Sequence, residues 1–353
     1  MKGQGDAADA TGLIHGGEGA PPASRVPARV TSRDVARAAG VSQSTVSLVL
    51  KGSTQIPSAT QLRVRSAMEA LGYQRNAVAA ALRSRRTSAV LFAMPKSVVH
   101  SHLSAELLAG ATDEAALHGY CVVVQPSAAG AAEGVDLYRS QFVCGAVVFA
   151  IAVEDPVVST LVAAGCPTVT MLTACRGCPM AHAVVADDSG GAAEAVRYLL
   201  AKGHRKIGLV APHPVTDGTI ASGRIGGAHL AAAERGARID EAWVPDWTVS
   251  DGSDAGARLL ARSDRPTAIF AISDALAFGV MSAVAAAGMR VPDDIAIVGF
   301  DNLPWSQHFS PPLTTVDFPV YSVGRGAVRR LLRPEEAAEA EWVPTRLIVR
   351  GSA

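Results

Sequence analysis

The chain has 353 residues, of which 49% are hydrophobic and 18% are charged. This length predicts two or three domains, and this composition excludes a chain that is disordered throughout. The net charge is zero, from 32 Lys and Arg against 32 Asp and Glu, but residues 30–88 contain nine basic residues and only two acidic ones. A basic segment followed by a more acidic remainder indicates that the segment binds a polyanion.

The first 29 residues are rich in Gly, Ala and Pro and contain no long apolar stretch. A secretory signal peptide needs such a stretch, so we expect a flexible leader over 1–29 and a cytoplasmic protein. The longest nearly apolar run is 268–289, but Ser273, Asp274 and Gly279 interrupt it. This run favours a strand followed by a helix over a membrane span, and we expect no membrane partner.

The five cysteines do not suggest a disulfide framework in a chain of this length. Cys175 and Cys178 form a C-x-x-C pair, but no second pair of zinc ligands lies nearby, and Pro179 favours a loop. We therefore expect two loop thiols without an assigned role, no metal site and no cofactor.

Three short helices are predicted over residues 30–75. Thr31 is placed to cap the first helix, Gly40 to end it, and Ser42 to cap a second helix that reaches Leu50. A turn of about three residues that contains Gly separates the two, which is the spacing of a helix-turn-helix.

The third helix is predicted to begin at Pro57-Ser58 and to end at Gly72. We expect one side of it to pack on the other two helices. That side carries Leu62, Ala67, Met68 and Leu71.

The segment from Val30 to Gly52 reads VTSRDVARAAGVSQSTVSLVLKG, and it resembles the DNA-binding head of the lactose/galactose repressor family. The similarity continues through Leu71-Gly-Tyr73 and from Asn76 to Leu82. The resemblance implies a head whose second helix lies in the major groove, with its N-terminal residues at the base edges.

Gln43 and Ser44 occupy those N-terminal positions. A glutamine can form two hydrogen bonds with an adenine edge, and a serine can bond several edges; the alternative is an ordinary exposed helix start. Family members usually have Arg where this chain has Leu48, which can touch a thymine methyl, so we expect a different operator preference there. The candidate DNA contacts in the head are Thr31, Ser42, Gln43, Ser44, Thr45, Ser47 and Leu48.

In this family a hinge helix follows the head and orders on operator DNA, which implies a hinge and linker over 76–86. By the resemblance, the DNA contacts there are Asn76, Ala79 and Leu82, and Leu82 is expected to wedge between base steps in the minor groove. The segment is alanine-rich but too short to be a stable helix alone. The alternative is a solvated basic linker.

Strand-like and helical segments alternate from residue 87 to 353, which predicts doubly wound α/β layers with ligands at the carboxyl ends of the strands. The predicted strands are 89–94, 120–125, 146–151, 167–172, 184–187, 207–211, 268–273 and 295–300. The predicted helices are 103–118, 191–201, 255–261 and 275–288.

Several motifs in this region resemble the sensor core of the same family, which is similar to periplasmic sugar-binding proteins. They include Gly203-His-Arg-Lys-Ile207, Val298-Gly-Phe-Asp301 and Pro312-Leu-Thr-Thr-Val316. The expected fold is a small all-α helix-turn-helix head plus an α/β periplasmic-binding-protein-like core of two doubly wound subdomains. The first subdomain is expected over about 87–187 plus 303–333, and the second over about 188–302 plus 334–353.

The resemblance gives four candidate effector-binding residues. Arg224 is expected in a Gly-flanked loop before a helix, where its guanidinium suits a carboxylate, a phosphate or sugar hydroxyls. Trp247 offers a flat face to a sugar or a purine, or it packs in the core. Asp274 contacts the ligand or caps a helix, and Asp301 contacts the ligand or supports the hinge between subdomains. His100, His102 and His213 remain unassigned.

No P-loop, G-x-S-x-G or HExxH motif is present, so we expect no enzyme activity. The sequence predicts a sequence-specific transcriptional regulator, as a repressor, that binds double-stranded operator DNA as a homodimer; the absence of a heptad tail favours dimers. A small molecule such as a sugar or sugar derivative is expected to control it. A solute-binding module and an enzyme on an α/β scaffold are the alternatives. The identity of the effector, the operator and the direction of control stay open.

Overall fold

The structure is a computed structural model that describes residues 30–50, 53, 55–73, 88–99, 103–126, 131–150, 152–173, 182–213, 219–336 and 339–353. It divides into a unit that ends at Ala80 and a unit that begins at Ala81. Within the described residues, no helix has the length and apolar character that crossing a membrane requires. Several predictions lie outside the described residues: the leader, Asn76, Ala79, Leu82, His100, His102, Cys175 and Cys178.

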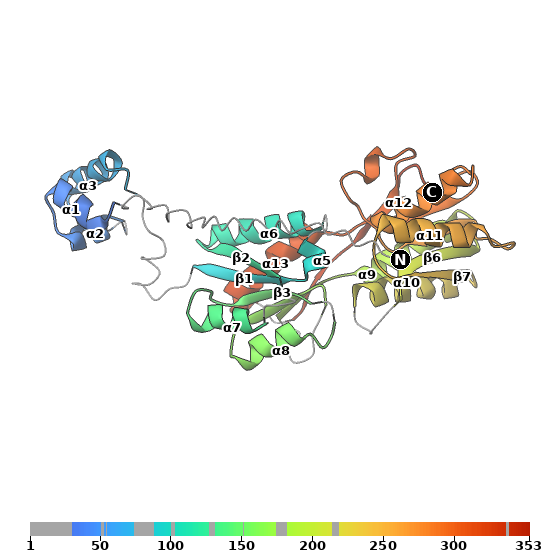
Figure 1. The fold of residues 1–353 in the computed structure, drawn as a ribbon, viewed down its shortest axis with the longest axis horizontal. Coiled ribbons are helices and arrows are strands. Elements are labelled where there is room, and N and C mark those ends of the chain that lie inside the picture. The colour runs from blue at the N-terminus through green and yellow to red at the C-terminus, as the bar shows by residue number, and fades with distance from the viewer. Residues whose placement is uncertain are drawn as a thin grey trace, which may run out of the picture. The chain divides into compact units, whose positions relative to one another are not determined.

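The first unit, which we call the head, contains α1 (Ser32–Ala39), α2 (Gln43–Leu50) and α3 (Ser58–Ala70) (Figure 1). Thr31 caps α1 as predicted, since its hydroxyl accepts the backbone N–H of Asp34 at 3.4 Å. Gly40 ends the helix in the left-handed region, at φ 62°, where a side chain would be disfavoured. The predicted three-residue turn between α1 and α2 is therefore confirmed.

The buried side of α3 differs from the prediction. Val64 is completely buried, and Ala67 and Met68 pack on the core of the head, but Leu62 and Leu71 are 67% and 37% exposed. Residues three and four positions apart share a helix face, whereas Leu62 is two positions from Val64 and so points away from it.

The second unit, which we call the core, contains two six-stranded sheets. The first has the order β11-β5-β4-β3-β1-β2. Its strands are β1 (Ala89–Met94), β2 (Cys121–Pro126), β3 (Ala146–Phe149), β4 (Thr168–Met171), β5 (Ala183–Ala186) and β11 (Glu341–Val343). All its neighbouring strands are parallel. We call this sheet with its helices the first lobe.

The second sheet repeats the same topology, with the order β12-β10-β9-β8-β6-β7. Its strands are β6 (Lys206–Pro212), β7 (Arg238–Val244), β8 (Ala268–Ala271), β9 (Ala296–Asp301), β10 (Thr314–Asp317) and β12 (Arg346–Ile348). Its strands are parallel except that β12 runs antiparallel to β10. We call this sheet with its helices the second lobe.

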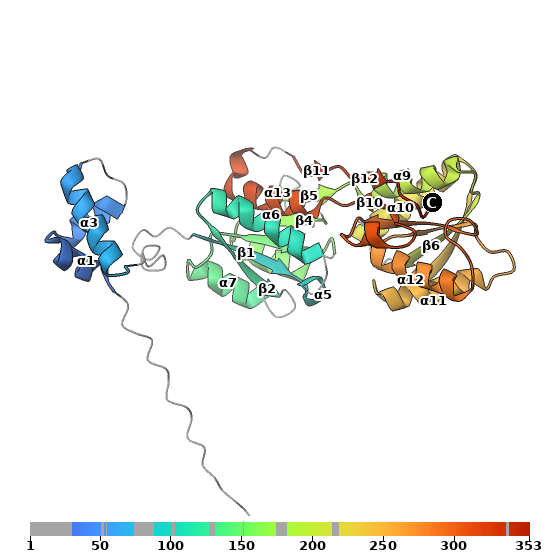
Figure 2. The same cartoon turned by 90° about the horizontal axis from the view of Figure 1, so that it is seen from above.

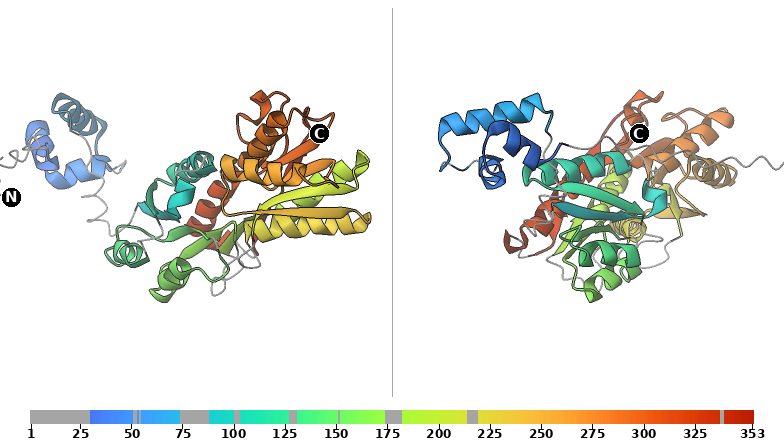
Figure 3. Two further views of the ribbon diagram at one scale, coloured as in Figure 1. Left: turned by 45° about the vertical axis from the view of Figure 1, so that its right-hand side comes forward. Right: turned by 60° about the vertical axis from the view of Figure 1, so that its left-hand side comes forward.

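Helices cover both faces of each sheet (Figures 1 and 2). In the first lobe these are α6 (Leu103–Leu117) and α13 (Val320–Leu332) on one face, and α7 (Ala131–Arg139) and α8 (Pro156–Ala163) on the other. In the second lobe they are α9 (Asp188–Ala201) with α10 (Ile220–Glu234), and α11 (Val249–Leu260) with α12 (Asp274–Ala286) (Figure 3). The short elements are α5 (Lys96–Val99), η2 (Ser306–His308) and η3 (Pro334–Glu336).

The chain passes between the two sheets three times. The first crossing joins β5 to α9, the second joins β10 to α13, and the third joins β11 to β12. The first and third crossings are tied together, because the Thr345 hydroxyl donates to the carbonyl of Asp187 at 2.9 Å.

The predicted subdomain boundaries after residue 302 need correction. We expected 303–333 in the first lobe, but Thr314–Asp317 pairs in parallel with β9 and belongs to the second. We expected 334–353 in the second lobe, but Glu341–Val343 pairs with β5 and belongs to the first. Both segments are short strands at or near sheet edges, and a sequence does not show which of two sheets such a strand will join.

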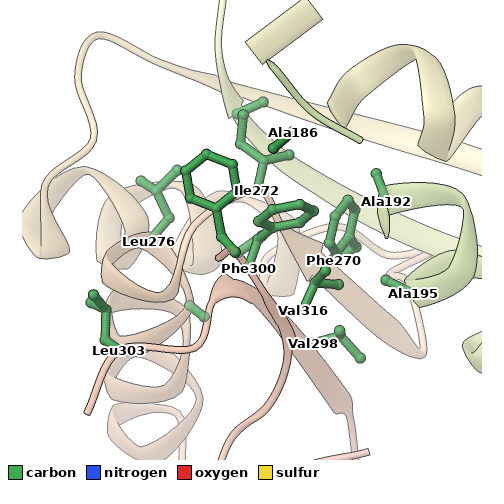
Figure 4. Close-up of a cluster of buried hydrophobic side chains, with 14 of the residues drawn as sticks. Ala186, Ala192, Ala195, Phe270, Ile272, Leu276, Val298, Phe300, Leu303 and Val316 are labelled. Carbon is green, nitrogen blue, oxygen red and sulfur yellow. The ribbon is translucent and has the colours of Figure 1, made fainter. Parts of the chain in front are cut away.

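One apolar cluster of the core reaches into both sheets, and a second, separate cluster lies within the first lobe. Figure 4 shows part of the cluster that reaches into both sheets, including Phe270, Phe300 and Val316 of the second sheet together with Ala186, the last residue of β5 in the first. The ends of β5, β8 and β9 are therefore packed close together, and the polar residues that follow these strands lie next to a dry apolar environment.

Glycines allow α11 and α12 to pack closely. A Cβ added at Gly279 would overlap the carbonyl oxygen of Val249, and one added at Gly252 would overlap that of Leu276. Backbone atoms cannot move aside as a flexible side chain can, so each position requires glycine.

We predict that Gly279→Ala lowers the free energy of unfolding of the core by about 2 kcal/mol, because the two helices must separate. Gly226→Ala is a matched control inside α10, where an added Cβ meets nothing within 4 Å. This control should be neutral or slightly stabilising, since alanine favours a helix over glycine. Urea unfolding measures both, and equal effects of the two variants would contradict the packing argument.

Candidate functional sites

The N-terminal turn of α2 presents polar side chains to solvent. Gln43, Ser44 and Ser47 are exposed, whereas Val46 and Val49 are buried against the rest of the head. The helix therefore has one face committed to the core of the head and one face available to a partner.

Local hydrogen bonds hold this exposed turn in place. The Ser42 hydroxyl accepts the backbone N–H of Thr45 at 3.1 Å, which caps the helix as predicted, and it also lies 2.7 Å from the hydroxyl of Ser44. The Gln43 amide donates to the hydroxyl of Ser32 at 2.8 Å. Leu48 is 37% exposed one turn further along the helix, where its side chain can also meet a partner.

Arg224 lies inside a helix, not in the predicted loop. Thr219 and Ser222 form reciprocal cap hydrogen bonds that start α10 at Ile220, so the glycines on either side of Arg224 are helical. The arginine side chain is almost completely buried, with the residue 1% exposed. A buried guanidinium needs partners for its charge and for its N–H groups.

Three partners surround the Arg224 guanidinium. Its Nε donates to Oδ1 of Asp188 at 2.8 Å, and its Nη1 donates to Oδ1 of Asp301 at 2.9 Å and to the carbonyl of Ile272 at 2.7 Å. The structure therefore joins Arg224 and Asp301, which the sequence indicated separately, and it adds Asp188, which no sequence pattern indicated.

Aromatic rings enclose the same guanidinium. Its central carbon lies 3.7 Å from the centre of the Phe300 ring and 4.8 Å from that of Phe318. The ring of Trp247, which is partly buried, lies 6.0 Å away. Trp247 is therefore next to Arg224, and the rings exclude water from the ion pairs.

The Asp274 carboxylate is buried and is fully engaged within the protein. It accepts hydrogen bonds from the Ser306 hydroxyl and the Thr315 hydroxyl, both at 2.5 Å, and from the backbone N–H of Leu303 at 2.8 Å. The cap of α12 is the neighbouring Ser273, whose hydroxyl accepts the N–H of Leu276. Asp274 thus fixes the segment that follows β9.

The buried carboxyl groups have raised pKa values. Burial raises the pKa of Asp301 to about 7, and the charge of Arg224 opposes this rise. Burial also raises the pKa of Asp274 to about 6, opposed by its hydrogen bonds from Ser306 and Thr315. The pKa of Asp188 is raised by burial as well, again against Arg224. The raised pKa values of these three carboxyl groups have the same main cause, which is the loss of water around them.

Hydrogen bonds connect this cluster to two of the crossings. Asp301 and Asn302 both have positive φ, 112° and 54°, and Asn302 donates through Nδ2 to Asp317 at 2.8 Å. Arg350 donates to Asn302 Oδ1 at 2.7 Å and holds it from the other side. Asp317 ends β10 directly before the second crossing, and Asp188 directly follows the first. Contacts of Arg224 are thus linked to the segments where the lobes meet.

No described part of the chain brings together three His, Cys, Asp or Glu side chains that could hold a metal ion. His213 instead places its ring 5.0 Å from the ring of Trp243.

The head with its exposed, capped second helix and the core with two similarly wound lobes define a class of protein. A helix-turn-helix of this kind is a DNA-binding unit, and a core of two such lobes is the architecture of periplasmic ligand-binding proteins. Comparisons with known proteins identify the family.

The model of bacterial regulatory proteins of the lacI family matches residues 31–76, and the model of the periplasmic binding protein-like domain matches residues 196–353. The transcriptional regulator DegA of Bacillus subtilis (strain 168) is 30% identical over 335 residues, which cover 92% of this chain and 98% of DegA. The chain therefore belongs to the lacI family, and it is a DNA-binding transcriptional regulator.

Two solved structures have the same architecture. The lac repressor dimer, bound to its operator and the anti-inducer ONPF, matches with a TM-score of 0.80 and 27% identity, covering 92% of this chain and 99% of that one. The complex of the regulator CelR with cellobiose matches with a TM-score of 0.67 and 29% identity, covering 92% of this chain and 100% of that one.

We predict that the stability advantage of the wild type over Asp301→Asn decreases as the pH rises. The folded state binds the Asp301 proton more tightly than the unfolded chain, so this contribution is present below about pH 4 and is lost as the pH rises through about 7. Between about pH 5 and about pH 7.5, the difference in the free energy of unfolding should fall by about 2 kcal/mol.

Urea unfolding at several pH values measures this difference. Asp294→Asn is the control, because hydrogen bonds from Arg290 hold the pKa of Asp294 below its usual range. Its titration lies below this window, so its difference from the wild type should stay constant. A difference for Asp301→Asn that is constant or rises with pH would refute the assignment.

Proposed function

We propose that this regulator is a repressor whose binding to operator DNA is controlled by a small molecule in the core. The observation that carries the DNA-binding part is the start of α2, where exposed Gln43 and Ser44 sit on a capped helix whose other face is buried. A helix anchored in this way can present side chains to base edges without losing its own packing. The described residues that we assign to the DNA interface are Thr31, Ser42, Gln43, Ser44, Thr45, Ser47 and Leu48.

The basic residues of the head support this assignment, because neutralising phosphates supplies most of the sequence-independent affinity for DNA. Thr31 and Ser42 cap α1 and α2. Their role at the interface is therefore to place helix N-terminal N–H groups near phosphates. Leu48 offers an apolar contact to a thymine methyl. We also assign Asn76, Ala79 and Leu82 to a hinge that contacts the minor groove, by resemblance to the family.

For the effector, we propose a sugar or a related metabolite that binds at the carboxyl ends of the strands, near Arg224 and Trp247. The aromatic face of Trp247 suits the apolar side of a sugar ring, and Arg224 carries the link to the crossings. Asp301 orients Arg224, and Asp274 fixes the segment beside it. CelR was solved with cellobiose, a ligand of this chemical class.

Control of DNA binding then follows from the position of the site. A ligand that contacts both lobes changes the angle between them, and the three crossings carry this change. The ligand favours whichever lobe arrangement it binds better, and the hinge segments of two subunits respond to that arrangement.

We further propose that the regulator acts as a homodimer. The Phe309 ring stacks on Phe278 of α12 at 4.1 Å between centres yet remains 37% exposed, and Val249 at the start of α11 is 47% exposed. Burial of such side chains by a second copy is favourable. We assign the protein no catalysis, and we place it in the cytoplasm, on the nucleoid when it is bound to operator.

We predict that Gln43→Ala lowers affinity for the preferred operator by about 1–3 kcal/mol and leaves affinity for random DNA nearly unchanged. The operator is first selected from a random double-stranded library, in which a palindromic motif is expected. Ser66→Ala, at an exposed position of α3, is the matched control and should bind as the wild type does. A selection that yields no motif, or an unchanged operator affinity for Gln43→Ala, would show that α2 does not read bases.

We predict that a panel of neutral sugars and nucleosides contains a compound that raises the melting temperature of the wild type and changes its operator affinity. Trp247→Leu should abolish this rise, because leucine lacks the flat ring. Trp342→Leu is the control, since Trp342 is 63% exposed on edge strand β11. Stabilisation that survives Trp247→Leu would place the ligand elsewhere.

A further inference from the structure

Asp188 is a buried carboxylate at the first position of α9 that sequence patterns did not distinguish from its neighbour. Asp187 is the residue that caps the helix, since its Oδ1 accepts the backbone N–H of Gly190 at 2.8 Å. Asp188 is therefore not needed for capping, and its side chain turns to Arg224 instead.

The nitrogen atoms of Arg224 are nearly all engaged. Nε is bonded to Asp188, and both hydrogens of Nη1 are used by Asp301 and Ile272. Of the three guanidinium nitrogens of Arg224, only Nη2 has no hydrogen-bond partner among the residues that the structure describes.

A carboxylate or phosphate binds a guanidinium best through two parallel N–H groups on adjacent nitrogens. One such edge of Arg224 consists of Nε and Nη2, and the other of Nη1 and Nη2. Each edge already has one nitrogen occupied, so neither can hold an anion in the two-pronged manner without displacing a partner.

The charge around Arg224 also opposes an anion. Two carboxylates bond to one guanidinium, and Asp274 is close enough that its charge raises the pKa of Asp301. The rings of Phe300 and Phe318 exclude water, so these charges are poorly screened. A ligand anion would therefore meet carboxylates without gaining a free cation.

We propose that Asp188 is a specificity-determining residue of the ligand site, which gives Arg224 a second carboxylate beside Asp301 so that the site accepts uncharged polyhydroxyl ligands and rejects phosphorylated ones. This inference rests on the ligand site proposed above. Nη2 of Arg224 then serves as a single donor to a hydroxyl oxygen, and Trp247 supplies the apolar contact. The alternative role of Asp188, as a structural brace only, predicts no effect on which ligands bind.

The test compares the affinity for inorganic phosphate, at constant ionic strength, of the wild type and of Asp188→Asn. Asparagine keeps the shape of the side chain but removes its charge, so only Asp301 still offsets Arg224 and the excess negative charge around the guanidinium is lost. We expect the variant to bind phosphate at least about tenfold more tightly than the wild type, by calorimetry and by thermal shift.

Asp187→Asn is a matched control, because it removes the same charge one residue away and asparagine also caps helices well. It should bind phosphate as weakly as the wild type does. The double variant Asp188→Asn/Arg224→Gln should lose the gained affinity, which assigns the effect to the guanidinium. A gain of the same size in Asp187→Asn, or a gain that survives the double variant, would overturn the proposal.

Phosphate binding by the wild type is a second test, and it does not depend on how the variants fold. Tight binding of phosphate by the wild type would also overturn the proposal, whereas weak binding beside a neutral ligand that stabilises the protein supports it. If no neutral compound stabilises the wild type, the proposed effector function fails. The phosphate comparison between Asp188→Asn and Asp187→Asn still decides the role of Asp188.

Discussion

The arrangement of the core depends on one buried cation. The guanidinium of Arg224 has left water, which is unfavourable unless its charge and its hydrogens are satisfied, and Asp188, Asp301 and the carbonyl of Ile272 satisfy them. These partners come from the start of α9, the end of β9 and the residue after β8, so one side chain fixes three elements. Removing Arg224 would leave both carboxylates without their cation in an apolar environment, with a cost of about 3–5 kcal/mol.

Strands buried on both faces were predictable because their apolar runs are continuous; the eight predicted strands are all present, with ends that shift by up to two residues. The strand Arg238–Val244 was missed, since this edge strand alternates exposed or half-buried residues with buried ones and offers no continuous run. The start of the helix that holds Arg224 was also misplaced, because three glycines near it suggest a turn. Its capping pair, Thr219 and Ser222, was the available signal.

The site was predictable only in part. The sequence motifs indicated Arg224, Trp247 and Asp301 separately, and the structure places them together. Asp188 could not be chosen over Asp187, since two adjacent acids after a strand give the same local pattern and only the fold decides which one caps the helix. In the head, by contrast, the caps and the short turn are local features, and the sequence alone placed all three helices.

The three crossings mean that neither lobe is encoded by a continuous stretch of the chain. Strand β11, near the C-terminal end, completes a sheet that begins with β1, and β12 then returns to the other sheet. During translation, almost the entire polypeptide must therefore emerge from the ribosome before either sheet acquires its last strand. Recombination between genes of such regulators faces the same restriction. A single exchange point inside the core leaves at least one lobe as a chimaera, whereas an exchange between head and core transfers an intact sensor to a new DNA-binding domain.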